Sequence, residues 1–427
     1  MLFGWIATAA ALSAQGTVLD RSETVERLAK LMEESYSYPA VGKKMADAVR
    51  ERNRKGEYRA FGKGEELAQR LTEDLTSVSR DKHVFVRFSA DVLPPEPEKL
   101  TEPSTEQLEE QRKMLALENF GLKKAEVLAG NVGYLDFRYF APISLAGDAY
   151  HGAMAAIAST DALIIDLRNN TGSMDPETIP TLAGYFFARP VHLGDLQWRW
   201  EKQPRQFWSA AEVPGKRYLD KPVYLLTSNK TFSGGEAMAY EFQALKRATL
   251  VGERTGGGAN PNIIRRIDDH FIASVPSGIA KNAVTGTNWE ETGVVPDVPV
   301  PAVQALRTAH LALLRKLNAE AKEGWDRHRL SEALRQVEET PDLARKVRFK
   351  LSGFEKAAKV TLAGTFNYWS TEATPLRREG NAWVADALVE PGRHAYKFIV
   401  DGKWTSDPAN PRHEPGEGDT DSVIIVE

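Results

Sequence analysis

The chain has 427 residues, which is enough for two or three folded domains and excludes a single small module. Its 55 Lys and Arg side chains are balanced by 59 Asp and Glu side chains, and no long basic block is present, so we expect no nucleic-acid partner. The sequence contains no cysteine, which excludes disulfides, a thiolate nucleophile and iron–sulfur ligation.

The first residues have the pattern of a secretory signal. Residues 2–12 form an apolar run (LFGWIATAAAL) that is followed by the small residues SAQG, typical of a signal-peptidase site. We predict a signal peptide over residues 1–16 and an exported, periplasmic or extracellular protein. The first basic residue, Arg21, follows the run instead of preceding it, so an apolar N-terminus of the folded chain is the alternative. No later run could span a bilayer, and we expect no integral membrane segment in the mature chain.

Residues 17–90 are predicted to form a helical N-terminal domain. Apolar residues recur there at helical spacing, and the clearest are Val25, Leu28, Leu31 and Met32. Residues 91–118 begin with the Pro- and Glu-rich stretch DVLPPEPEKLTEP and continue as a charged helical piece, which is typical of a linker.

The central and C-terminal parts of the chain differ in pattern. Between residues 119 and 303, short apolar runs such as ALIIDLR and VYLLTS alternate with helical stretches, which predicts a layered α/β core. Residues 304–344 return to helical spacing and form a helical connector. Residues 345–427 contain short apolar strands at regular spacing, which predicts an immunoglobulin-like β-sandwich.

Ser233 lies between a predicted strand, residues 223–228, and a predicted helix. A hydroxyl at a helix N-terminus is close to free backbone N–H groups that stabilise an oxyanion, and Gly234 and Gly235 let a substrate approach the backbone. The alternative is structural, because SGGE is also a capping box with Ser233 as the N-cap and Glu236 reaching back.

Four motifs in a fixed order carry a family resemblance. These are IIDLRNNTG (164–172), TSNKTFSGGE, VGERTGGGA (251–259) and TGTNWEETGVVPDV (285–298). Together they resemble the tail-specific, or C-terminal processing, serine peptidases, and within them the branch related to interphotoreceptor retinoid-binding protein and tricorn protease. The resemblance covers residues 20–303 and implies a crotonase- or ClpP-like α/β catalytic core without cofactors. We also expect no metal centre, since none of the 8 His residues lies in an HExxH motif.

The resemblance implies that Ser233 is the nucleophile. Many tail-specific members activate it with a Lys about twenty-five residues downstream, which falls near Gly258 in this chain. No Lys occurs between Lys246 and Lys281, so a Ser/Lys dyad is unavailable.

Other members use the His of an Asp-x-His motif, which corresponds to DKH and therefore to His83 as the general base. A surface position at a strand edge is the alternative for His83. Lys82 stands where tricorn-like members have a small hydroxyl residue. Glu290 matches the acidic residue that completes the family site; the neighbouring Glu291 could be mistaken for it, and a solvated turn carboxylate is the alternative.

The resemblance also suggests an oxyanion hole. The backbone N–H groups of Gly234 and Gly172 are the expected donors. Ser173 replaces a second glycine that the family usually has at this loop. Arg168 could fix the loop or meet a peptide carboxylate, and the sequence does not choose between these roles.

Residues 345–427, through VTLAGTFNYWS, HAYKFIVDGKWTSDPANP and DSVIIV, resemble the glycogen-binding module of carbohydrate-binding family 48. The resemblance implies that Trp369 and Trp404 stack on glucose rings while Lys397 donates hydrogen bonds to hydroxyls. Asp421 stands where the family has a sugar-contacting Asn. The alternative is that both tryptophans only pack within the sandwich or against the peptidase.

We therefore expect an exported serine endopeptidase that acts on a peptide or protein substrate and carries a β domain for α-glucan. Two alternatives remain at this point: a non-catalytic binding protein on the same scaffold, and a glucan-binding protein with a vestigial peptidase core.

Overall fold

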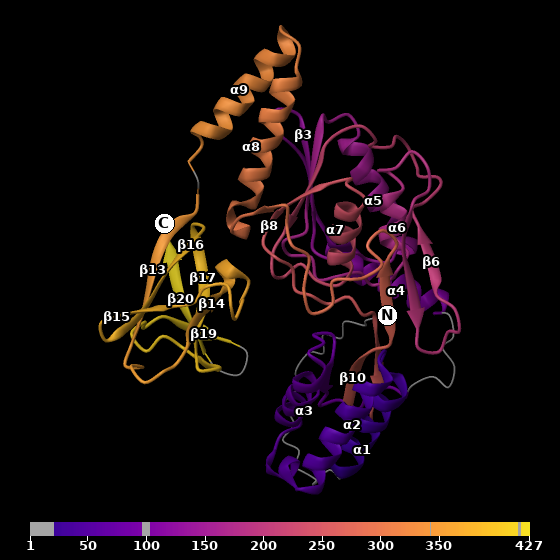
Figure 1. Cartoon of the computed structure of the whole chain (residues 1–427), viewed down its shortest axis with the longest axis vertical. Coiled ribbons are helices and arrows are strands. Elements are labelled where there is room, and N and C mark those ends of the chain that lie inside the picture. The colour runs from indigo at the N-terminus through magenta and orange to yellow at the C-terminus, as the bar shows by residue number, and fades with distance from the viewer. Residues whose placement is uncertain (1–20, 96–102, 342, 417–419) are drawn as a thin grey trace.

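Figure 1 shows the computed structural model, which describes residues 21–95, 103–341, 343–416 and 420–427. The N-terminal helices lie at one end of the molecule, the α/β core lies above them, and the β domain lies beside the core (Figure 1). Within the described ranges, no helix combines the length and apolar character that crossing a membrane requires. The expected signal peptide, residues 1–16, lies outside the described residues.

The N-terminal domain is built on α1 (Arg21–Ser35), α2 (Pro39–Arg54), α3 (Gly64–Ser79) and β1 (Phe85–Phe88). Their apolar faces bury against one another, as the helical spacing predicts. The structure differs from the expected division of the chain at one point. β1 pairs with β10 (Phe271–Pro276), which pairs with β9 (Asn262–Arg266), and side chains of this later hairpin complete the N-terminal core.

A six-stranded sheet forms the centre of the α/β core. Its strands are, in spatial order, β12 (Val298–Pro299), β8 (Thr249–Gly252), β7 (Val223–Thr227), β4 (Ala162–Asp166), β3 (Val132–Phe137) and β2 (Leu122–Leu128). All neighbours are parallel except β2 and β3. The inner strands β3, β4 and β7 are apolar on both faces because helices cover both faces of the sheet, whereas the edge strand β2 is largely exposed.

Alternate side chains of β3, β4, β7 and β8 enter two different cores. One core contains α5 (Ile143–Ile157), α6 (Thr178–Ala183) and α7 (Gly234–Ala244). The other contains α8 (Ala302–Glu320) and α9 (Trp325–Glu339), so the segment expected as a connector, residues 304–344, supplies a full layer of the core. The core also carries α4 (Thr105–Ala116), which lies in the expected linker, and a small sheet of β11 (Gly278–Asn282), β5 (His192–Trp198) and β6 (Arg205–Trp208).

The C-terminal domain consists of two antiparallel sheets with a shared apolar core, as the sequence predicts. One sheet contains β13 (Arg345–Ser352), β16 (Ala382–Val389) and β15 (Arg377–Glu379). The other contains β14 (Val360–Gly364), β17 (Gly392–Val400), β18 (Lys403–Thr405), β20 (Thr420–Val426) and β19 (His413–Pro415).

Candidate active site

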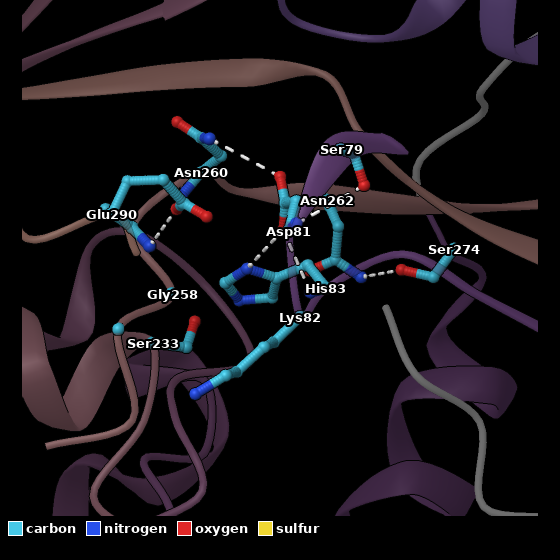
Figure 2. Close-up of polar contacts among 12 residues, drawn as sticks. Ser79, Asp81, Lys82, His83, Ser233, Gly258, Asn260, Asn262, Ser274 and Glu290 are labelled. Atoms are coloured by element: carbon cyan, nitrogen blue, oxygen red, sulfur yellow. Dashed lines mark hydrogen bonds and ion pairs between the residues drawn. The ribbon is translucent and has the colours of Figure 1, made fainter. Parts of the chain in front are cut away.

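Three loops follow neighbouring parallel strands of the core: residues 167–173 after β4, 228–233 after β7 and 253–261 after β8. The carboxyl ends of parallel strands lie at one edge of a sheet, which is where open α/β sheets bind ligands. His83 arrives from the N-terminal domain and meets these loops (Figure 2).

Ser233 ends the turn between β7 and α7. Its backbone has φ 50° and ψ −118°, a conformation that residues other than glycine rarely adopt and that is concentrated at functional sites. The Ser233 N–H donates to Glu236 Oε2 at 2.9 Å, which is one half of the predicted capping box. The hydroxyl is thus held at the N-terminus of α7, where backbone N–H groups and the helix dipole favour negative charge.

Glu236 connects the turn at Ser233 to the glycine-rich loop after β8. Its carboxylate accepts from the Thr255 hydroxyl (2.5 Å), from the N–H groups of Gly257 (2.6 Å) and Gly258 (2.9 Å), and from Ser233. Burial raises the pKa of Glu236, whereas these four donors oppose the rise. This residue therefore does more than cap α7, and only the tertiary contacts reveal it.

The imidazole of His83 lies beside the turn at Ser233. Its ring packs on Phe232, the residue before Ser233, with centroids 4.6 Å apart. Nδ1 is 3.6 Å from Asp81 Oδ1, and both ring nitrogens are buried without a hydrogen-bond partner among the described residues. In the view of Figure 2, the ring lies between the level of the Ser233 hydroxyl and that of the Glu290 carboxylate.

The surroundings of Gly258 show why a Lys at this position and the observed place of the His83 ring exclude each other. A Cβ at this position would lie 2.3 Å from Phe232 Cζ and 2.7 Å from His83 Cε1. Both distances are far inside van der Waals contact, so this position, where the resemblance to tail-specific peptidases led us to look for a Lys, is closed to any side chain while the imidazole is in place.

Glu290 approaches His83 from the loop after β11. Its Oε2 accepts from the N–H groups of Ala259 (2.6 Å) and Asn260 (3.1 Å), while Oε1 is buried without a partner in the described part of the chain. Burial, and next the negative charge of Asp81, raise the pKa of Glu290 to about 7. The adjacent Glu291 is exposed and is not the residue at the site.

Asp81 is a site residue to which the sequence analysis assigns no role, although it belongs to the Asp-x-His motif. It accepts from the His83 N–H (2.9 Å), the Tyr36 hydroxyl (3.1 Å) and the Asn260 amide (3.4 Å), which fix the carboxylate beneath the ring. Ligand-capable atoms of Asp81, His83 and Glu290 lie within 4.8 Å of one another, so this group could also hold a divalent ion.

Two basic residues have structural contacts. Lys82 Nζ donates to the Gly256 carbonyl at 2.6 Å, and so supports the glycine-rich loop. Arg168 forms a two-pronged ion pair with Asp166 and donates to the Ala302 carbonyl at 2.7 Å. Of the two roles considered for Arg168, these contacts favour fixing the loop.

The expected oxyanion donors require a correction. The Gly172 N–H donates to Asn170 Oδ1 at 3.0 Å and is therefore already engaged. A Cβ at 172 would lie 2.9 Å from Ser233 Cβ, so this glycine permits close approach instead of donating. The N–H groups of Gly234 and Ser173 have no hydrogen-bond partner within the described ranges, and they are the available donors.

The β domain brings Trp369 and Trp404 together, with ring centroids 6.2 Å apart and Trp404 46% exposed. Lys397 differs from its expected role. Its side chain is 5% exposed, and Nζ is paired with Asp421 Oδ1 at 3.0 Å. The carboxylate that replaces the family's Asn therefore engages the ammonium group that was expected to meet the sugar.

Comparison with known proteins identifies the parts of the chain. Residues 131–300 match the model of peptidase family S41. The chain thus carries a peptidase family S41 domain. Residues 12–121 match the N-terminal domain of peptidase S41 in eukaryotic IRBP, and residues 346–427 match the glycogen recognition site of AMP-activated protein kinase. The expected family resemblances are confirmed, and the chain carries a peptidase family S41 domain together with a glycogen-binding-type domain.

Individual relatives agree with this division. The 5'-AMP-activated protein kinase subunit beta-1 of Rattus norvegicus is 40% identical over 89 residues, which are 21% of this chain and 32% of that protein. The Sus scrofa subunit is 41% identical over 83 residues, 19% of this chain and 65% of the relative. The match thus spans about a third of the length of the rat subunit. Among solved structures, mature CPAF has the same core fold, with 12% identity, a TM-score of 0.51, and coverage of 70% of this chain and 97% of the other.

Proposed function

We propose that this chain is an exported serine endopeptidase in which Ser233 is the nucleophile, His83 the general base and Glu290 the carboxylate that stabilises the charged imidazole. The observation that carries the proposal is the His83 ring, which is buried without a hydrogen-bond partner among the described residues and packs on Phe232 beside the nucleophile. Buried polar groups are normally paired, and an unpaired imidazole at a strained serine turn is ready to take a proton.

Peptide hydrolysis then follows from the geometry. His83 takes the hydroxyl proton while Ser233 Oγ forms a bond to the peptide carbonyl carbon. The carbonyl oxygen becomes negative and accepts from the N–H groups of Gly234 and Ser173. The intermediate collapses, the C–N bond breaks, and His83 gives its proton to the departing amine. Water next attacks the acyl-enzyme with His83 as base, which releases the second peptide and restores the serine.

Fluorophosphonate labelling tests this assignment. We expect the full chain to be labelled at Ser233, and His83→Ala to lower the labelling rate by about a hundredfold or more, the usual contribution of a general base. His328→Ala, at an exposed position on α9, is the matched control and should label like the wild type. A folded wild-type protein that is not labelled would instead support a non-catalytic binding protein.

For the β domain we propose α-glucan binding through Trp369 and Trp404. The proximity of the two rings and the exposure of Trp404 support it, since aromatic faces suit the C–H face of a pyranose. Retention of the full chain on amylose should drop at least tenfold in Trp404→Ala. Equal retention of the variant and the wild type would contradict the proposal.

Export is supported by the apolar run of residues 2–12 and the small residues after it. Expression of the full chain in a bacterium, followed by fractionation and N-terminal sequencing of the mature protein, tests it. Cleavage near residue 16 and recovery outside the cytoplasm are expected, whereas an intact N-terminus in the cytoplasmic fraction would contradict export.

A further inference from the structure

A turn of the β domain contacts the core next to the nucleophile. We call residues 365–369 the tryptophan turn. The Asn229 side-chain amide donates to the Asn367 carbonyl at 3.0 Å, and Lys230 Nζ lies 5.9 Å from the centre of the Tyr368 ring, within cation–π range. Both core residues belong to the loop that follows β7 and ends at the nucleophile.

Tyr368 lies near charged groups of both the core and the β domain. Burial raises the pKa of Tyr368, the Arg168 guanidinium opposes the rise, and the carboxylates of Asp166, Glu390 and Glu253 add to it. Burial raises the pKa of the Glu253 carboxylate, and the backbone N–H of Asn229, which lies near it, opposes the rise. Asn229 therefore lies between this carboxylate of the core and the tryptophan turn, which its side-chain amide contacts.

The backbone of the tryptophan turn is unfavourable by itself. Tyr368 has φ 54° and Trp369 has φ 58°, so two successive residues other than glycine are left-handed. Such a conformation persists only where surrounding contacts impose it. Within the β domain, the Trp369 N–H donates to the Gly364 carbonyl and the Asn367 amide donates to the Leu362 carbonyl, both at 2.8 Å. The contacts of Asn367 and Tyr368 with the core add to these bonds, so docking supports the turn that presents Trp369.

The loop from Asn229 to the nucleophile is tightly bonded. The Thr231 hydroxyl donates to the Leu167 carbonyl at 2.7 Å and accepts the Ser228 N–H at 2.9 Å. The Phe232 N–H donates to the Asn170 carbonyl at 3.0 Å. Two of these bonds anchor the segment between Asn229 and the nucleophile to the loop after β4, so a shift of Asn229 would strain them next to Ser233.

We propose that the tryptophan turn couples the two activities, so that an α-glucan bound at Trp369 and Trp404 increases the reactivity of Ser233. The sugar favours the docked turn, because that turn presents Trp369, and the docked turn holds Asn229 and the nucleophile loop. A ligand shifts such an equilibrium by its difference in affinity for the two states, and the coupling is reciprocal. This inference rests on both proposed functions.

The test measures the full chain with and without maltoheptaose. We expect the sugar to raise the fluorophosphonate labelling rate by at least about fivefold, the lower end of measured couplings. Hydrogen exchange provides a readout that needs no catalysis: backbone amides of residues 229–233 should exchange more slowly with the sugar bound. Tyr368→Ala should lose both effects and bind amylose at least about fivefold more weakly, and Tyr368→Phe should retain them because the ring is kept.

Lys356→Ala is the matched control, since this residue is exposed elsewhere in the β domain, and it should behave as the wild type. Sugar that binds but changes neither labelling nor exchange would overturn the coupling and leave both proposed functions intact. Absence of sugar binding would overturn the coupling together with the glucan proposal. If Ser233 is never labelled, unchanged exchange at residues 229–233 would still overturn the coupling, whereas slower exchange would support it.

Discussion

Replacing Gly258 by alanine adds one methyl group, which we expect to displace the His83 ring and so to slow the reaction of Ser233. Its Cβ would be 2.7 Å from His83 Cε1 and 2.3 Å from Phe232 Cζ, whereas ordinary contact begins at 3.4 Å. In Gly258→Ala the imidazole must therefore move by about 0.7 Å (3.4 minus 2.7) and the phenyl ring by about 1.1 Å (3.4 minus 2.3). The φ angle of Gly258 lies outside the left-handed region, so the effect comes from the side-chain contact and not from backbone strain.

A misplacement of about 1 Å costs roughly a hundredfold in rate, and overpacking costs about 1–3 kcal/mol of stability. We therefore expect Gly258→Ala to lower the rate of fluorophosphonate labelling by about a hundredfold while the protein remains folded. The assay is the second-order labelling rate, with thermal unfolding followed by circular dichroism on the same preparation.

Gly152→Ala is the matched control, because a Cβ there has no neighbour within 4 Å and the residue is exposed in α5. It should label as the wild type and unfold at a slightly higher temperature, since alanine favours helices. Wild-type labelling by a folded Gly258→Ala protein would refute the assigned place of the imidazole in catalysis.

Three further predictions follow from single carboxylates. Because the pKa of Glu290 is raised to about 7, labelling should rise as pH increases through 7 and the carboxylate becomes ionised, and Glu290→Gln should lose this rise. The raised pKa also means that protonated Glu290 stabilises the fold below pH about 4.5, and that this contribution is lost as pH rises through about 7. Glu236→Ala leaves four buried donors unpaired, and at about 1–3 kcal/mol each it should lower the free energy of unfolding by more than about 3 kcal/mol. Asp421→Asn should release Lys397 toward sugar hydroxyls and strengthen retention on amylose about threefold, the value of one ordinary hydrogen bond.

Each outcome has a counterpart that would contradict it. A labelling profile in Glu290→Gln with the wild-type rise near neutral pH would assign that rise to another group. Urea unfolding of Glu236→Ala at the wild-type midpoint would show that its four hydrogen bonds contribute little. If Asp421→Asn and Lys397→Met were both retained on amylose like the wild type, the ammonium group of Lys397 would have no part in sugar binding.

Much of the site was predictable because its parts are local. The strand ending at Thr227, the turn at Ser233 and the helix after it follow from residues that are neighbours in the chain, whereas the strained backbone of Ser233 is visible only in the structure. The absence of a Lys near Gly258 is likewise visible in the sequence, and it directs attention to a histidine base. Periodicity also predicts the three classes of architecture, since burial on one face or on two faces leaves different apolar patterns.

Only the folded chain reveals which distant groups meet. The ring of His83 arrives from another domain, and the N–H of Gly172 proves to be engaged by Asn170. Lys397 is expected at a sugar and is found paired with Asp421. The hairpin of residues 262–276 packs with the N-terminal helices although the chain places it within the catalytic core.

The physical reason is that the interactions recognisable in a sequence act between residues that are close along the backbone. Apolar periodicity and turn chemistry are imposed by neighbours along the backbone, so a segment of ten residues carries them completely. The partner of a buried charge or of a free N–H is decided by distances in space, which depend on how the layers pack. For this protein, the sequence determined that a serine stands at a helix N-terminus in an α/β core, and tertiary structure decided what surrounds it.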